Sequence, residues 1–509
     1  MMGSWIILPV VLPATMAPLI VLAARHDIVL ARIFSLAATS ALVPLALALW
    51  WASGSGPEVY LLGDWPAPFG IVLVLDRLSA LMLVLTSLLS VAVAIYAIGG
   101  FDSRGRHFHA LFQFQLMGVN GAFLTGDVFN LFVFFEVLLI ASYGLMLHGA
   151  ASRALTAGFQ YIAINLVGST LFLIAVGLIY AVTGTLNMAD LIVKVPLVAD
   201  ADQALLRVGG LLLLTVFAIK ASLVPLHFWL PGTYAATGAP VAALFAIMTK
   251  VGAYSILRVH TAVFGAAADS AGSWLAGPWL VPLALVTAAI GTLGVLGASR
   301  LRDQACFALV GSMGTLLVAI GLFSPTATAA ALFYLVSSTL AAAGLFLAID
   351  LLASRRGEAG DRAEPAPALP GQDLVAGLFF LGALLMVGMP PLSGFFGKLL
   401  VLDAARGDAW MAWIWAVLLA TSLAAIIGFG RTGSAVFWKS AALPPAPEGA
   451  APPLRPAAVA AVAGLLLLAA LQTVLAGPAM RAFDAIAAEL HDPQAYVAAV
   501  LGPRQEAVR

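Results

Sequence analysis

The sequence predicts an all-α protein embedded in a membrane, with about fourteen helices that cross the bilayer. The chain is 62% hydrophobic and only 9% charged, whereas a soluble domain is about 25% charged. Its apolar residues gather in runs of about 20, which is the length that spans a bilayer. The net charge is zero, so the composition gives no reason to expect nucleic acid as a partner.

Taken in order, the apolar runs define the expected helices, although several of their boundaries are soft. Very short links at 125–127 and 324–326 join two pairs of runs, so each pair should form a tight helical hairpin. A polar stretch at 353–373 contains three prolines and is expected to be a loop. The expected spans are 4–24, 30–52, 72–98, 107–125, 128–148, 158–183, 205–230, 240–262, 278–298, 303–323, 327–352, 373–402, 409–438 and 456–476.

Prolines stand well inside the seventh and the twelfth expected helix, at Pro225 and at Pro390–Pro391. A proline in a helix removes a backbone donor and breaks the helix. Two broken helices at matching places predict two inverted repeats with a site between them. The expected division is a three-helix segment at 1–106, five-helix repeats at 107–262 and 278–438, and a region at 439–509 with the last transmembrane helix and an amphipathic interfacial tail.

Four isolated charges lie inside these apolar runs: Glu136, Lys220, Lys250 and Lys398. A charge at the centre of a bilayer costs at least about 2.5–3.5 kcal/mol and usually marks an ion or proton path. Lysine can release its proton when buried, whereas arginine stays charged. We therefore expect Glu136 and Lys220 to act as a functional pair in proton transfer. The alternative is a static ion pair that only fixes helix packing.

His227 follows Pro225 at the first break, where it could join the proton path or bond a freed carbonyl. The sequence shows no metal-binding spacing of His and Cys, and its one cysteine, Cys306, cannot form an internal disulfide. No nucleotide loop or nucleophile motif is present. We therefore expect no metal and no cofactor, and an ion transporter rather than an enzyme.

Lysine and arginine are more frequent in one set of alternate loops than in the other, which predicts that this set is cytoplasmic. An even number of helices then places both termini outside. The richer set includes Arg104, Arg106, Arg300, Arg302, Arg355 and Arg356.

Three long runs, at 108–147, 165–190 and 217–259, resemble the D-type subunit of the Mrp (also called Pha or Mnh) multisubunit cation/proton antiporters. The wider group includes the antiporter-like subunits of respiratory complex I and of membrane-bound hydrogenases. The resemblance implies fourteen core helices with broken seventh and twelfth helices. It also implies other antiporter subunits as partners, protons and Na⁺ or K⁺ as transported ions, and the cytoplasmic membrane of a bacterium as the location.

The resemblance gives the four charges a common role as protonatable groups along the middle of the membrane. Many relatives carry a histidine in the eleventh helix, where this sequence has Ser337. The hydroxyls of Ser337, Ser338 and Thr339, together with water, are therefore the expected link between the two halves. Two other functions stay open: a proton-pumping subunit of a redox complex, and a scaffold in which the charges are inert packing pairs.

Overall fold

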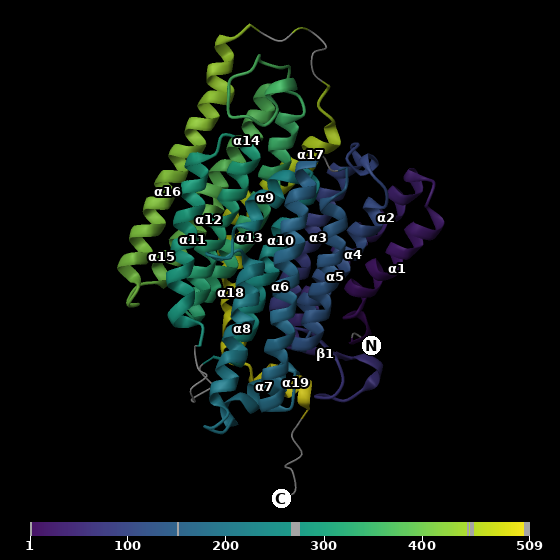
Figure 1. Cartoon of the computed structure of the whole chain (residues 1–509), viewed down its shortest axis with the longest axis vertical. Helices are drawn as coiled ribbons and strands as arrows, with labels where there is room; N and C mark the ends of the chain where they lie inside the picture. The colour runs from purple at the N-terminus through teal and green to yellow at the C-terminus, as the bar shows by residue number, and fades with distance from the viewer. Residues whose placement is uncertain (1–2, 150–151, 266–274, 445–446, 448–451, 503–509) are drawn as a thin grey trace, which may run out of the picture.

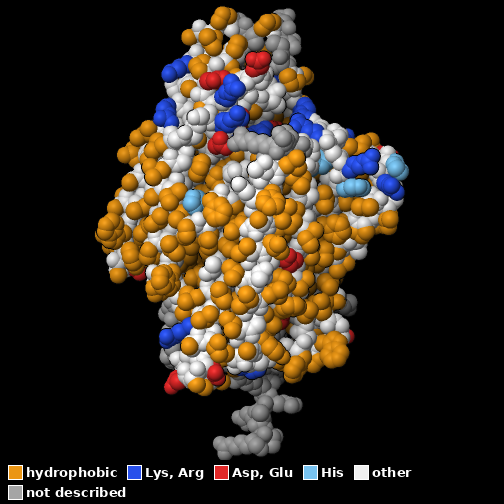
Figure 2. Space-filling view, viewed as in Figure 1, with side chains coloured by type: hydrophobic (Ala, Val, Ile, Leu, Met, Phe, Trp, Pro, Cys, Tyr) orange, Lys and Arg blue, Asp and Glu red, His pale blue; other side chains and the backbone are white. Residues whose placement is uncertain are grey.

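The computed structural model describes residues 3–149, 152–265, 275–444, 447 and 452–502. Most helices run along the long axis of the molecule (Figure 1). In the view of Figure 2, hydrophobic side chains dominate the middle of the surface, while lysines and arginines gather mainly toward its upper end. Within the described ranges, eleven helices are long and apolar enough to cross a membrane. The predicted fold class, an all-α membrane protein, is confirmed.

The N-terminal part contains two helices, a small hairpin and a third helix. Strand β2 is buried and pairs with β1 in antiparallel register, Glu58 opposite Leu75 and Leu61 opposite Val72. The span expected at 72–98 is therefore shorter, because its first residues form this strand and the helix begins at Arg77, after its N-cap Asp76, which forms a capping box with Ser79. The elements are α1 (Leu8–Ala23), α2 (Ile28–Ala52), β1 (Glu58–Leu61), β2 (Val72–Leu75) and α3 (Arg77–Ile98).

The next group of helices holds the first break. The predicted hairpin link is confirmed, because Asp127 accepts a hydrogen bond from the backbone of Asn130 and so starts a new helix three residues after the previous one ends. A short helix capped by Asn187 was not predicted. The elements are α4 (Phe108–Leu124), α5 (Val128–Met146), α6 (Ser152–Thr183), α7 (Met188–Lys194), α8 (Gln203–Ala221), α9 (Trp229–Ala236) and α10 (Ala239–Ile256).

The second group repeats this pattern around a second break. Helices α11 and α12 approach so closely that a Cβ on Gly291 would overlap the backbone of Gly311. Helix α13 lies in the middle of the bundle (Figure 1) and nearly all of its residues are buried. The elements are α11 (Gly277–Gly297), α12 (Leu301–Gly321), α13 (Pro325–Ala353), α14 (Gln372–Val387), α15 (Ser393–Ala404) and α16 (Met411–Gly433).

Both predicted helix breaks are present and share a backbone pattern. The C-cap residue of α8 is Ser222, whose φ is 58°, and that of α14 is Gly388, whose φ is 81°. In each break this left-handed residue stands three positions before a proline, Pro225 or Pro391. The first break separates α8 from α9, and the second separates α14 from α15. The next helix along the chain, α10 or α16, continues directly into a π-helix, at Leu257–Val263 and Ser434–Trp438. These matches agree with two repeated halves, while the repeat boundaries stay a prediction.

The C-terminal region contains α17 (Pro456–Val474), α18 (Ala476–His491) and α19 (Gln494–Leu501). We expected the tail after α17 to lie at the membrane interface. Instead, α18 packs against α13 inside the bundle and buries Phe483, Ile486 and Leu490. The rings of Phe333 and Phe483 meet edge to face. The amphipathic pattern is real, but its apolar face is covered by protein.

Candidate functional site

The four predicted charges lie on different helices of the bundle interior. Glu136 is on α5, Lys220 is in the last turn of α8, Lys250 is on α10 and Lys398 is on α15. Lys250 has no exposed surface and Lys220 is 8% exposed, whereas Glu136 and Lys398 are half-buried. Each charged group therefore depends on protein partners for the hydrogen bonds that water would otherwise provide.

Glu136 and Lys220 are not in direct contact, which differs from the pair that the sequence suggested. The amine of Lys220 donates to Oδ1 of Asn165 at 2.7 Å. Glu136 accepts a hydrogen bond from the hydroxyl of Ser169. Asn165 and Ser169 are both on α6, one turn apart, so this helix connects the two charges through neutral polar groups. No ion pair joins Glu136 and Lys220 among the side chains that the structure describes.

The contact between Asn165 and Lys220 is held by further hydrogen bonds. Nδ2 of Asn165 donates to the carbonyl of Tyr161, and the Tyr161 hydroxyl meets the hydroxyl of Ser142 at 2.8 Å. The indole of Trp229, the first residue of α9, donates to the carbonyl of Ile219 beside the break. Tyr161, Asn165, Lys220 and Trp229 line one small cavity. The rest of the lining is apolar, so Asn165 and the Tyr161 and Trp229 side chains provide the few polar groups beside the lysine.

Lys250 is enclosed where α10 packs on α8. A Cβ on Gly252 would lie 2.6 Å from the backbone nitrogen of Ala221, so the two helix backbones touch next to Lys220. The Lys250 amine is buried and has no hydrogen-bond partner in the described part of the chain. An amine in this position is costly to keep charged, because nothing described there compensates for the lost water.

The three hydroxyls predicted on α13 differ in what they contact. Ser337 meets Ser393 at the start of α15, with 2.8 Å between the oxygens, and Ser393 donates to the carbonyl of Ala469. Ser338 and Thr339 donate to the carbonyl of Leu335 within their own helix. Of these three described hydroxyls, only that of Ser337 therefore forms a hydrogen bond to another helix, at Ser393 beside the second break.

Lys398 turns back toward the break that precedes its helix. Its amine donates to the carbonyl of Val387, the last residue of α14, at 2.7 Å and to the hydroxyl of Ser422 at 2.9 Å. A cation at the C-terminal end of a helix is favoured by the helix dipole and by the free carbonyls there. The break thus holds the lysine inside the bundle.

His227 lies half-buried in the first break, and its Nδ1 has no hydrogen-bond partner among the described groups. The sequence analysis missed a second histidine, His260, in the π-helix after α10. This ring is 1% exposed, stacks on Phe264, and has neither nitrogen hydrogen-bonded in the described structure. Its one sequence signal was its place inside an apolar span, since a π-helix leaves no pattern of its own.

The sequence analysis also missed a buried ion pair, which shows how this fold holds a charge that has a structural role. Arg258 reaches Asp76 at 2.5 Å and 2.8 Å through two nitrogens. Its guanidinium also faces the rings of Tyr254 and Tyr496. Burial alone would raise the pKa of Asp76, but the charge and hydrogen bonds of Arg258 hold that pKa below its usual range. Among the described side chains, no carboxylate pairs in this way with the three interior lysines.

Fold and site together define an integral membrane protein with broken helices and buried ionisable groups along its interior, which is the class of ion-translocating subunits. The family model described as "NADH:quinone oxidoreductase/Mrp antiporter, TM" matches residues 125–427. The chain belongs to this family and, within it, to the group of D-type subunits of Mrp antiporters.

Three known proteins illustrate the likeness. The chain is 42% identical to a probable K⁺/H⁺ antiporter subunit of the D type from Rhizobium meliloti, over 98% of each chain. It is 35% identical to the D-type Na⁺/H⁺ antiporter subunit of Bacillus subtilis, over 98% of this chain and 100% of that one. A chain in the structure of the Mrp complex from Dietzia sp. matches with a TM-score of 0.87 and 30% identity, over 98% of this chain and 99% of that chain.

Proposed function

We propose that this chain is the proton-conducting membrane subunit of a multisubunit antiporter that exchanges Na⁺ or K⁺ for protons. One observation carries the proposal: in the described structure, none of the three interior lysines bonds a carboxylate. Lys220 donates to an amide, Lys398 donates to a carbonyl and a hydroxyl, and the Lys250 amine has no hydrogen-bond partner. Lysines that only fixed helix packing would be expected to pair with carboxylates, as Arg258 does with Asp76.

The proposed path begins at Glu136, passes Ser169 and Asn165, and reaches Lys220. It continues through Lys250 on α10 toward α13. The Ser337–Ser393 contact is the proposed link to Lys398 at the second break. Ser338 and Thr339 are secondary candidates because their hydroxyls are engaged by their own helix, and His227 is a candidate beside Lys220. Water in the breaks would join groups that do not touch.

The proposed setting is the cytoplasmic membrane of a bacterium, with both termini outside and the end that is rich in lysine and arginine in the cytoplasm. The other antiporter subunits would be its partners, and no nucleic acid or cofactor is involved. Residues 107–262 and 278–438 would form the two inverted halves, flanked by 1–106 and 439–509.

A second candidate function is proton pumping in a redox complex of the complex I or hydrogenase type, because the matching family description includes NADH:quinone oxidoreductase. The identity to antiporter subunits favours antiport. Purification of the native assembly distinguishes the two, since a redox complex would contain iron–sulfur proteins.

The test is proton flux in inverted vesicles that carry the whole complex, with Na⁺ and K⁺ supplied separately. Glu136→Gln and Lys220→Ala should each reduce cation-dependent flux to background while the complex still assembles. Lys439→Ala is the matched control, because Lys439 is an exposed lysine after the end of α16. Normal flux in an assembled Lys220→Ala complex would refute the proposed path.

A further inference from the structure

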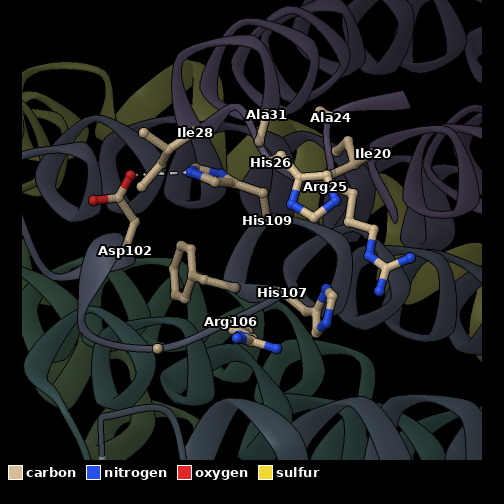
Figure 3. A pocket seen from close by; sticks show the side chains of 12 residues that line it. Ile20, Ala24, Arg25, His26, Ile28, Ala31, Asp102, Arg106, His107 and His109 are labelled. Atoms are coloured by element: carbon tan, nitrogen blue, oxygen red, sulfur yellow. Dashed lines mark hydrogen bonds and ion pairs between the residues drawn. The ribbon is translucent and has the colours of Figure 1, made fainter. Parts of the chain in front are cut away.

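A pocket that none of the buried lysines lines opens where α1 ends and where α2 and α4 begin. Its lining includes Arg25, His26, Arg106, His107 and His109. In Figure 3, His109 lies between Asp102 and the group formed by His26, Arg25 and His107. Figure 2 shows blue and pale-blue side chains gathered over the upper ends of α1 and α2. The pocket is therefore rich in groups that attract an anion.

The N-terminus of α4 faces this pocket, and no side chain caps it in the described structure. Its N-cap residue, His107, has a φ of 64° and makes no capping hydrogen bond there. Phe108 and His109, the first residues of the helix, line the pocket. By contrast, α2 also begins here, but Asp27 caps it through the backbone of Val29 and Leu30. Free N–H groups at a helix start bind anions such as phosphate.

The one carboxylate among the described lining residues, Asp102, is already engaged. Arg32 donates to its two oxygens at 2.6 Å and 2.9 Å, and Nε2 of His109 meets it at 3.1 Å. Burial alone would raise the pKa of Asp102, but the hydrogen bonds from His109 and Arg32 lower it to about 2. Because Arg32 neutralises Asp102, the positive charges of Arg25 and Arg106 dominate the described lining.

His109 supplies an independent sign of a missing ligand. The residue is 4% exposed, and its Nδ1 is buried without a hydrogen-bond partner in the described structure. A buried polar atom of this kind costs about 1–3 kcal/mol when it is left unpaired. Because the Asp102 carboxylate can only accept, Nε2 carries a proton, and Nδ1 donates to an anion oxygen when the ring is in its imidazolium form.

We propose that this pocket binds one phosphate group, held by Arg25, Arg106, His109 and the N-terminus of α4. The wall also contains the apolar side chains of Ile20, Ile28 and Phe108. An apolar wall beside a cationic rim suits the headgroup of an anionic phospholipid, and basic pockets between transmembrane helices bind such headgroups. Free inorganic phosphate shares the same chemistry and is the other source to be tested.

The test uses the purified whole complex in neutral detergent at fixed ionic strength. Three probes are titrated separately: dioctanoyl phosphatidylglycerol, dioctanoyl phosphatidylcholine and inorganic phosphate. Native mass spectrometry counts the bound molecules and gives their affinities. We expect the anionic lipid to bind at least tenfold more tightly than the neutral lipid. The Arg25→Gln/Arg106→Gln variant should lose this preference, and Arg25→Lys/Arg106→Lys should retain part of it.

The matched control is Arg300→Gln/Arg362→Gln, which removes two arginines that are paired with Asp361 and Glu364. This control should bind the anionic lipid like the wild type. If inorganic phosphate binds as tightly as the lipid and is lost in the same variant, the site stands and its ligand comes from solution. Equal binding of both lipids by the wild type, or unchanged binding in the Arg25→Gln/Arg106→Gln variant, would overturn the proposal. Weakening of wild-type lipid binding by salt provides a check that needs no variant.

Discussion

Asn165 and Ser169 lie one turn apart on α6 and bond Lys220 and Glu136 respectively. The two charges most easily recognised in the sequence are therefore connected by two uncharged side chains. An amide and a hydroxyl can reorient as a proton arrives or leaves, whereas a direct ion pair would hold both charges in place. This arrangement favours a role in transfer over a static role in packing.

The first prediction concerns these two linking residues. Ser169→Ala and Asn165→Leu should each lower cation-dependent proton flux at least tenfold, because each removes the hydrogen bond that positions a charge. Thr170→Ala is the control, since Thr170 is exposed and donates to the carbonyl of Leu166 on its own helix. The measurement is dye quenching in inverted vesicles that contain equal amounts of complex. Wild-type flux in both variants would show that α6 takes no part in the path.

The second prediction separates stability from transport at Lys250. Its amine is fully buried and unpaired in the described structure, so Lys250→Met should stabilise the fold by about 1–3 kcal/mol. The same change should abolish transport, because methionine holds no proton. Melting temperature and flux are measured on one preparation, with Lys439→Met as the exposed control. A destabilised variant would mean that Lys250 has a partner that supports the fold.

Much of this fold could be predicted from hydropathy and proline positions. Pro225 and Pro391 marked both breaks because a proline cannot donate in a helix. Strand β2 was missed because only Asp76 and Arg77 separate its four apolar residues, Val72–Leu75, from the apolar run of the following helix. The placement of α18 was missed because an amphipathic face looks the same whether lipid or protein covers it.

The site was predictable as a set of charges but not as a set of contacts. Glu136 and Lys220 stood out because each is isolated in an apolar run. Asn165 and Ser169 carry no charge, and polar residues of this kind are common in transmembrane helices for packing alone. The role of Arg258 could not be predicted, because only the folded chain brings Asp76, 182 positions away, into contact with it.

The third prediction concerns Lys398. Lys398→Ala should block flux, and Lys398→Arg should also fail, because arginine keeps its charge at working pH and cannot pass on a proton. The arginine variant still carries a cation for the carbonyl of Val387, so its fold should be nearly unchanged. Flux is measured across a pH series. If Lys398→Arg transports like the wild type, the lysine supplies only charge at the end of α14.

The fourth prediction tests the buried ion pair. Arg258→Gln should destabilise the protein by about 3–5 kcal/mol, because it leaves Asp76 charged and unpaired in a buried place. The double change Asp76→Asn/Arg258→Gln should recover a large part of this loss. Thermal unfolding in detergent gives both values. Additive losses in the double variant would show that the two residues do not depend on each other.

The last prediction is a pH dependence at Asp127, which lies just outside the span of α5. Burial raises the pKa of this carboxyl from its ordinary 3.8 to about 6, although the backbone hydrogen bonds from Asn130 and Phe129 oppose the shift. A raised pKa means that the folded state favours the protonated form. The stabilising contribution is therefore complete below about pH 4 and is lost as the pH rises through 6.

Asp127→Asn should remove this dependence and still cap α5, since asparagine caps a helix as well as aspartate does. The variant should match the wild type near pH 4 and gain up to about 3 kcal/mol of stability over it at pH 8, because each pKa unit is worth 1.36 kcal/mol. Melting temperatures of both proteins are compared from pH 4 to 8.5. Asp403→Asn serves as the control, because Asp403 is 62% exposed. A constant difference between variant and wild type across the series would mean that Asp127 stays charged throughout, and the effect of burial on its pKa would have to be rejected.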